Sequence, residues 1–163
     1  MIALDAVRAE RIARAMVARC GGVYIRKSDV PGMAIVRAAF DALNALGLPV
    51  PTGVELDRYS HAIGPFAIIA DGMAPADLLA VATHECEHLL QFWQGEYSEG
   101  STQGAALAGG ASMAWLYLVE PEARVRFEAR AFRATIEAYR TLGLPIPSVN
   151  ELADALARGY ALD

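Results

Sequence analysis

Residues 84 to 88 have the sequence His84-Glu85-Cys86-Glu87-His88, in which two histidines are separated by three residues within a strongly helical stretch. An α-helix turns about 100° per residue, so the two imidazoles are about 40° apart and one turn apart along the helix. Two imidazoles in this arrangement can bind one tetrahedral zinc ion. A glutamate beside such an ion can take a proton from a metal-bound water, so the spacing predicts a zinc-dependent hydrolase.

A pair of histidines on a helix can also be an ordinary surface feature that forms ion pairs with its neighbours Glu85 and Glu87. The helical wheel argues against this alternative, because apolar residues form a wide stripe that is predicted to be buried: Leu79, Ala82, Cys86, Leu89, Leu90 and Trp93. The histidines flank this stripe in a polar strip that also contains Asp77 and Gln91. Such a strip is expected on the floor of a cleft.

A catalytic zinc site needs a third protein ligand and an open position for water. The metzincin arrangement is excluded, because Gln91 and Gln94 stand where its glycine and third histidine would be. The best remaining candidate is Glu128, in a predicted helix over 121–142. The large apolar residues of this helix lie within roughly 80° of Glu128: Val125, Phe132, Ile136, Tyr139 and Leu142. A carboxylate buried among them is costly unless it is paired or binds a metal. The alternative is a surface ion pair between Glu128 and Arg124.

With these residues in place, the chain resembles the gluzincins, metallopeptidases that bind zinc with the two histidines of H-E-x-x-H and a later glutamate. Residues 84–92 and the segment Phe127-Glu128-Ala129-Arg130-Ala131 are similar to the H-E-x-x-H-x-x-Q and F-E-x-x-A motifs of small metallopeptidases from bacteria and their phages. The resemblance covers about residues 66 to 140.

The resemblance implies that His84, His88 and Glu128 bind zinc and that the substrate is a peptide or protein. The wheel alone does not distinguish Glu85 from Glu87 as the general base, since each is about 60° from one histidine and 100° from the other. The resemblance favours Glu85. Glu87 would then lie at the rim and pair with a basic side chain.

The composition limits the remaining possibilities. A chain of 163 residues with 55% hydrophobic residues can bury one good core, so a single domain over residues 1–163 is expected. The resemblance implies that this domain is a zincin-like metallopeptidase. The net charge of −5 without a basic cluster argues against nucleic acid as a partner, and no apolar run is long enough for a membrane span. The N-terminus lacks the apolar region of a signal peptide, so a cytoplasmic location is expected. Cys20 and Cys86 are too few for a disulfide framework, and Cys86 is expected to pack in the core.

The periodicity predicts a mostly helical α+β fold with a small sheet before the active-site helix. Helices are expected at 3–19, 32–46, 75–94, 104–119 and 121–142, with a last one opening at the capping box of Ser148 and Glu151. Strands are expected at 23–26, 54–56 and 66–70. The resemblance implies that 66–70 is an edge strand that pairs with an extended substrate.

Some assignments stay open at this stage. The donors available to stabilise an oxyanion are His61, which is expected in a loop, Tyr97, Tyr117 and Tyr139. The polar segment 95–104 is a connector or a lid over the site.

Two other classes of protein compete with the hydrolase. One is a non-catalytic, zinc-stabilised binding or virion-associated module, with Glu87 or Asp77 as a fourth ligand. The other is a metal-free helical interaction protein.

Overall fold

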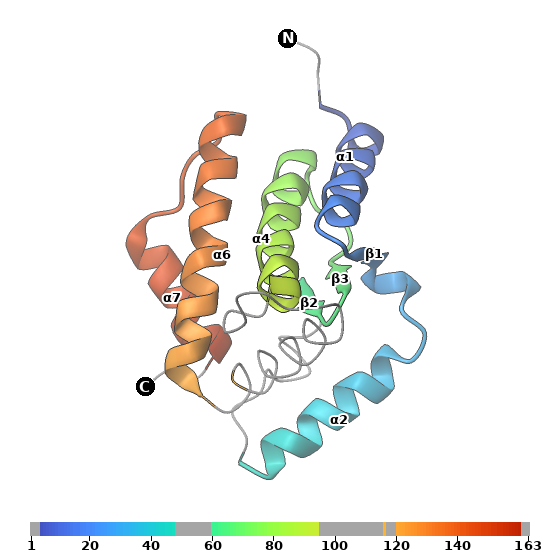
Figure 1. Cartoon of the computed structure of the whole chain (residues 1–163), viewed down its shortest axis with the longest axis vertical. Helices are drawn as coiled ribbons and strands as arrows, with labels where there is room; N and C mark the ends of the chain where they lie inside the picture. The colour runs from blue at the N-terminus through green and yellow to red at the C-terminus, as the bar shows by residue number, and fades with distance from the viewer. Residues whose placement is uncertain (1–3, 48–59, 95–115, 117–119, 161–163) are drawn as a thin grey trace.

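The computed structural model describes residues 4–47, 60–94, 116 and 120–160. These residues form a mostly helical α+β fold with one small sheet, as the sequence predicted (Figure 1). In chain order the elements are α1 (Ala6–Arg19), β1 (Val23–Arg26), the 3-10 turn η1 (Lys27–Asp29), α2 (Met33–Ala45), β2 (His61–Ile63), β3 (Phe66–Ile69), α4 (Pro75–Gln94), α6 (Pro121–Leu142) and α7 (Val149–Tyr160).

The three described strands precede α4 in sequence and pair in the order β1-β3-β2. β1 runs parallel to β3, with Val23 opposite Phe66, and β2 runs antiparallel to β3, with Ala62 opposite Ala67. β2 and β3 are joined by a two-residue turn that begins at Gly64, whose φ of 57° is accessible to glycine at little cost. The sheet therefore combines a tight hairpin with one parallel pair.

Two expectations about this sheet are wrong. The segment at 66–70 was expected to be an edge strand, but β3 is the central strand because β1 and β2 pair with its two sides. His61 was expected in a loop, but it is the first residue of β2. β2 has only three residues, which is too short for the alternation that identifies a strand in a sequence.

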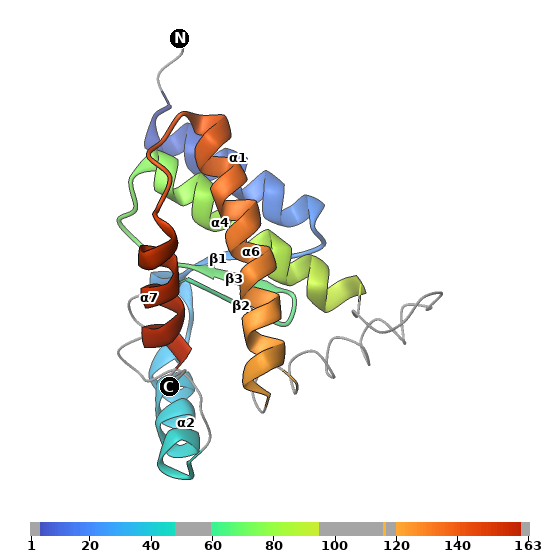
Figure 2. The same ribbon diagram turned by 90° about the vertical axis from the view of Figure 1, so that its left-hand side faces the viewer.

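The helix α4 lies between α1 and α6, and the sheet lies against the same bundle (Figures 1 and 2). α1 faces α4 with Ala9, Ala13 and Val17, which are spaced four residues apart and are fully buried. Small side chains at this spacing let two helices approach closely. The core formed by α1, α4 and the sheet includes Tyr24 and Ile69.

The connection from α1 to β1 also requires close approach. A Cβ atom on Gly22 would lie 2.3 Å from Cδ1 of Leu89, and one on Gly21 would lie 3.0 Å from Nε1 of Trp93. That indole nitrogen donates a hydrogen bond to the Gly21 carbonyl at 3.1 Å. The last turn of α4 is thereby held against the end of α1.

The helix ends match the sequence signals. The Asp5 side chain accepts a hydrogen bond from the Arg8 amide at 2.8 Å and caps α1. At α7, Glu151 accepts from the Ser148 amide and Ser148 Oγ accepts from the Glu151 amide, which confirms the predicted capping box. Gly143 ends α6 with a φ of 67°, the left-handed cap expected there.

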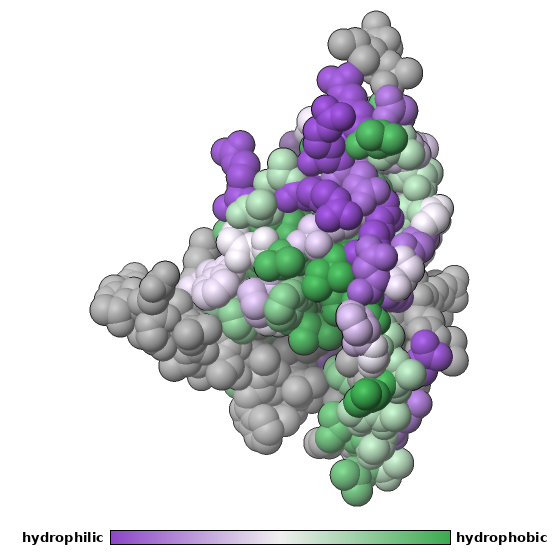
Figure 3. Space-filling model, turned by 90° about the vertical axis from the view of Figure 1, so that its right-hand side faces the viewer, coloured by the Kyte–Doolittle hydropathy of each residue, from purple (hydrophilic) through white to green (hydrophobic). Residues whose placement is uncertain are grey.

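α2 projects away from the three-helix body, and most of its side chains are exposed. Figure 3 shows hydrophilic surface over much of α1 and mostly apolar surface over α2. The predicted strand at 54–56 and the segment 95–104 lie outside the described residues, as does the predicted helix at 104–119 except for Leu116, which is helical. Among the helices that are described, none has both the length and the hydropathy needed to cross a bilayer.

Candidate metal centre

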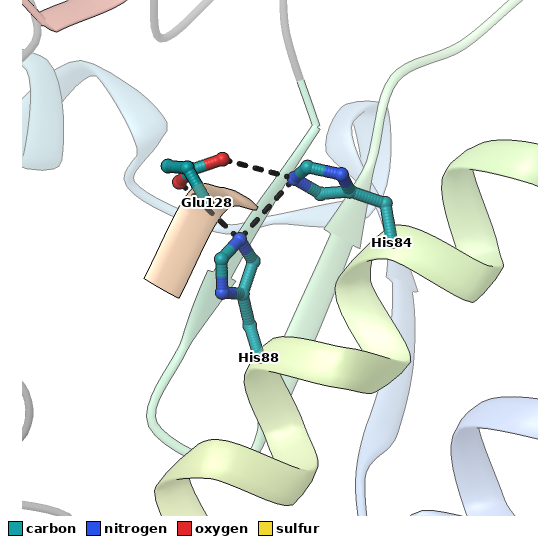
Figure 4. A group of neighbouring side chains, drawn as sticks. All are labelled: His84, His88 and Glu128. Atoms are coloured by element: carbon teal, nitrogen blue, oxygen red, sulfur yellow. Dashed lines mark hydrogen bonds and ion pairs between the residues drawn. The ribbon is translucent and has the colours of Figure 1, made fainter. Parts of the chain in front are cut away.

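The two histidines of α4 face α6, and their side chains converge on the carboxylate of Glu128 (Figure 4). Because they are four residues apart, their rings project from consecutive turns of one helix face. Their Nε2 atoms are 3.2 Å apart. Phe132 of α6 holds the ring of His84 in an edge-on contact, with 5.0 Å between the ring centroids.

Glu128 is 1% exposed and presents one carboxylate oxygen to each histidine. Its Oε2 atom lies 3.3 Å from Nε2 of His84, and its Oε1 atom lies 3.3 Å from Nε2 of His88. The structure thus brings together the three predicted metal ligands, which come from two different helices, α4 and α6. The alternative of a surface ion pair with Arg124 is excluded, because Arg124 is only 2% exposed.

These distances match the requirements of a metal ion. Ligand atoms about 2.0–2.2 Å from a tetrahedral ion lie roughly 3.3–3.6 Å apart. The 3.2 and 3.3 Å separations here are at or just below this range. Nitrogen from histidine and oxygen from a carboxylate are also common ligands of zinc. The donor set and its spacing therefore fit a divalent cation.

The other nitrogen of each histidine ring contacts a polar side chain. Nδ1 of His84 lies 3.2 Å from Oγ1 of Thr135, whose hydroxyl donates to the Ala131 carbonyl at 2.9 Å. Nδ1 of His88 lies 2.9 Å from Oε1 of Gln91. Since both partners present an oxygen that accepts, each neutral ring carries its hydrogen on Nδ1. Each ring then directs the Nε2 lone pair, which a metal needs, towards Glu128.

Electrostatics couple the triad. Burial, the largest single effect, would lower the pKa of His88, but Glu128, Glu85 and Gln91 together outweigh it and the pKa of His88 is raised to about 9. Burial also disfavours the charged form of Glu128, but the two histidines outweigh this effect and hold the pKa of Glu128 well below its usual value. Without a metal, the site therefore holds a proton next to a carboxylate.

Glu85 is buried beside this triad, with only 3% of its surface exposed. Burial raises the pKa of its carboxyl group, with a smaller contribution from Glu128, while His84 and His88 act in the opposite direction. Its Oε2 atom is buried and has no hydrogen-bond partner among the described residues. An unsatisfied buried carboxylate oxygen is costly, and such groups occur disproportionately at functional sites.

Glu87 has a different environment from Glu85. Its Oε1 atom forms a 2.9 Å ion pair with the Arg130 guanidinium, which links α4 to α6. The expectation that Glu87 pairs with a basic side chain is therefore confirmed. Asp77 lies near the N-terminal end of α4, where the Tyr139 hydroxyl is 3.5 Å away. Among the described residues, only His84, His88 and Glu128 form a cluster that could hold a metal ion.

The neighbours of Glu128 differ in part from those that the sequence predicted. Val125 and Leu142 were expected to be buried around Glu128, but they are 37% and 36% exposed. Arg124, Phe127 and Ala131 of α6 are buried, and the Phe127 carbonyl accepts a hydrogen bond from Gln91 of α4. The larger apolar residues Phe132 and Ile136 line a cavity of about 320 Å³ between α6 and α7. The hydropathy pattern of α6 thus reflects two packed faces.

Sequence reasoning gave no role to Gln91 and Thr135, although Gln91 was placed on the histidine face. For Gln91, the sequence offered one signal: a polar residue stands three positions after His88, on a helix face that is otherwise packed. Of the four proposed oxyanion donors, Tyr97 and Tyr117 lie outside the described residues. Tyr139 lies near Asp77, seven residues along α4 from His84, and so is remote from the triad.

Comparisons of this chain with known protein families, with curated proteins and with solved structures found no match.

Proposed function

We propose that this protein is a zinc-dependent metallopeptidase of the gluzincin type. The observation that supports this proposal best is the pairing of a possible three-ligand cluster, made by His84, His88 and Glu128, with the buried carboxylate of Glu85, whose Oε2 atom has no hydrogen-bond partner in the described part of the chain. Three protein ligands leave a coordination position for water, which is typical of catalytic rather than structural zinc. The assignment of a peptide as the substrate rests on the resemblance of the two motifs.

In this mechanism the protein residues hold the ligands and move protons. Zinc bound to the triad would supply Lewis-acid activation of a water molecule and of the substrate carbonyl. Glu85 accepts the proton of the attacking water and delivers it to the leaving amine. Its raised pKa suits both steps, because a base must bind the proton long enough to pass it on.

The proposal is tested by metal analysis and peptide digestion of three variants. Glu85→Gln should retain one zinc per chain and lose activity by roughly 10²–10⁴-fold, since it removes only proton transfer. Glu87→Gln is the matched control, and it should keep most of the activity because Glu87 pairs with Arg130. Glu128→Ala should lose zinc.

Each alternative predicts a different result. Zinc binding without cleavage of any peptide in a broad library would favour the zinc-stabilised module. Absence of zinc from the wild-type chain under saturating conditions would favour the metal-free interaction protein. Activity that survives Glu85→Gln would refute the base assignment.

A further inference from the structure

Gln91 occupies an unusual position between the two helices that carry the metal ligands. It is 1% exposed and lies on α4, three residues after His88. Its Oε1 atom is 2.9 Å from Nδ1 of His88, and its Nε2 atom donates to the Phe127 carbonyl of α6 at 3.1 Å. One buried amide therefore contacts one ligand directly and the backbone beside another ligand, Glu128.

The two hydrogen bonds determine the orientation of the amide. The Phe127 carbonyl can only accept, so the NH2 group of Gln91 must face α6. The amide oxygen must then face His88, and because this oxygen can only accept, Nδ1 of His88 must carry the hydrogen. The hydrogen-bond pattern thus selects one of the two neutral forms of the ring.

We infer that Gln91 is a positioning residue that holds His88 in its Nδ1–H tautomer and anchors the backbone next to Glu128, so that the ligands are arranged before an ion binds. The opposite tautomer would place a hydrogen on Nε2, where the ion must bind. The contact with Phe127 limits sliding of α6 along α4, which would separate Glu128 from the histidines. The consequence for metal affinity rests on the proposed zinc site, whereas the tautomer is a property of the polypeptide itself.

Four substitutions separate these effects. Gln91→Leu removes both hydrogen bonds at similar volume. Gln91→Glu keeps an oxygen for His88 but lacks the amide hydrogens for Phe127. Thr135→Val removes the corresponding oxygen from His84 and is the matched control for His88. Leu79→Ala, in the core on the other side of α4, controls for general destabilisation.

The first measurement uses the metal-free chain of 163 residues with 15N-labelled histidines. Long-range 1H–15N spectra, recorded at a pH above the His88 pKa of about 9, report which ring nitrogen carries the hydrogen. The wild type, Thr135→Val and Leu79→Ala should show His88 with its hydrogen on Nδ1. Gln91→Leu should shift His88 towards the Nε2–H form, and Gln91→Glu should restore the wild-type pattern.

The second measurement is zinc affinity by competition with a chelator. Gln91→Leu should weaken binding by roughly 10–100-fold, the usual effect of removing such a partner, and Gln91→Glu should bind more tightly than Gln91→Leu. Leu79→Ala should bind within about twofold of the wild type, since it leaves the ligands and their partners intact.

The outcomes distinguish this inference from the proposed function. A wild-type chain that shows the Nδ1–H form but binds no zinc would refute the zinc site and leave the role of Gln91 in the tautomer standing. A wild-type chain that binds zinc but shows His88 in the Nε2–H form, or a Gln91→Leu variant with unchanged tautomer and affinity, would overturn the inference about Gln91.

Discussion

His84 and His88 direct their Nε2 atoms at each other across 3.2 Å, each 3.3 Å from an oxygen of Glu128. Two neutral rings with hydrogens on Nδ1 would face each other with lone pairs, which repel. The contact is favourable only when a proton or a metal ion lies between the donor atoms. The site is therefore expected to exchange a proton for a cation, and this exchange has measurable consequences.

Zinc affinity and metal-free stability should respond to pH in opposite directions. In the metal-free chain, the pKa of His88 rises from 6.5 to about 9 on folding. This difference stabilises the fold below pH 6.5, and the stabilisation is lost as the pH rises through 9. Zinc binding displaces the proton of His88, so the affinity for zinc should increase by up to about tenfold per pH unit as the pH rises towards 9.

Thermal unfolding between pH 6 and 10, with and without saturating zinc, measures both effects. The midpoint of the metal-free chain should fall across this interval, and the gap between the two forms should widen. Parallel curves for the two forms would show that His88 does not exchange a proton for the metal.

A second pH effect comes from Glu10 on α1. Hydrogen bonds from Arg26 and then Arg14 lower the pKa of Glu10 from 4.5 to about 2, with distances of 2.8 Å and 2.7 Å. A lowered pKa stabilises the fold above pH 4.5, and this stabilisation is lost as the pH falls to 2. Glu10→Gln should cost roughly 1–2 kcal/mol at neutral pH, after allowance for solvent screening.

Denaturant titrations at pH 7 and at pH 2.5 test this prediction. The difference between Glu10→Gln and the wild type should shrink at the lower pH. Glu137→Gln is the matched control, because its partner Arg140 is 61% exposed and the pair should contribute little. A constant difference at both pH values would mean that Glu10 acts by packing rather than by charge.

Gly22 should be intolerant of even a methyl group. A Cβ atom at this position would lie 2.3 Å from Leu89 Cδ1, and Leu89 is next in sequence to His88, a proposed ligand. Gly22→Ala should destabilise the protein by about 1–3 kcal/mol through overpacking. A double-mutant cycle with Leu89→Ala tests the contact, since the penalty of Gly22→Ala should shrink when Leu89 is truncated. If the losses of stability from Gly22→Ala and Leu89→Ala simply add, the strain at Gly22 does not come from its contact with Leu89.

The helices that carry the site could be predicted from the sequence because both are long and have clear end signals. The predicted ranges 75–94 and 121–142 match α4 and α6. The pairing of these helices could not be derived from periodicity, since α6 has apolar residues on two faces. Phe132 and Ile136 line the cavity beside α7, while Phe132 also contacts His84 of α4 and Phe127 is buried. The choice of Glu128 as the candidate third ligand followed from the cost of burying a carboxylate, although Val125 and Leu142 proved to be exposed.

The sheet could be predicted only in part. β1 and β3 contain runs of β-branched and aromatic residues, whereas the three residues of β2 carry no pattern. Without β2, the central position of β3 could not be recognised. The roles of Gln91 and Thr135 depend on hydrogen-bond directions that exist only once α4 and α6 have packed.

The most direct test of the metal centre is a crystal structure of the chain grown with zinc, with anomalous data collected on both sides of the zinc absorption edge. We predict one peak between His84 Nε2, His88 Nε2 and the carboxylate of Glu128, at about 2.0–2.2 Å from each ligand atom. An anomalous map without a peak at these three residues, or with the ion bound to other side chains, would contradict the account.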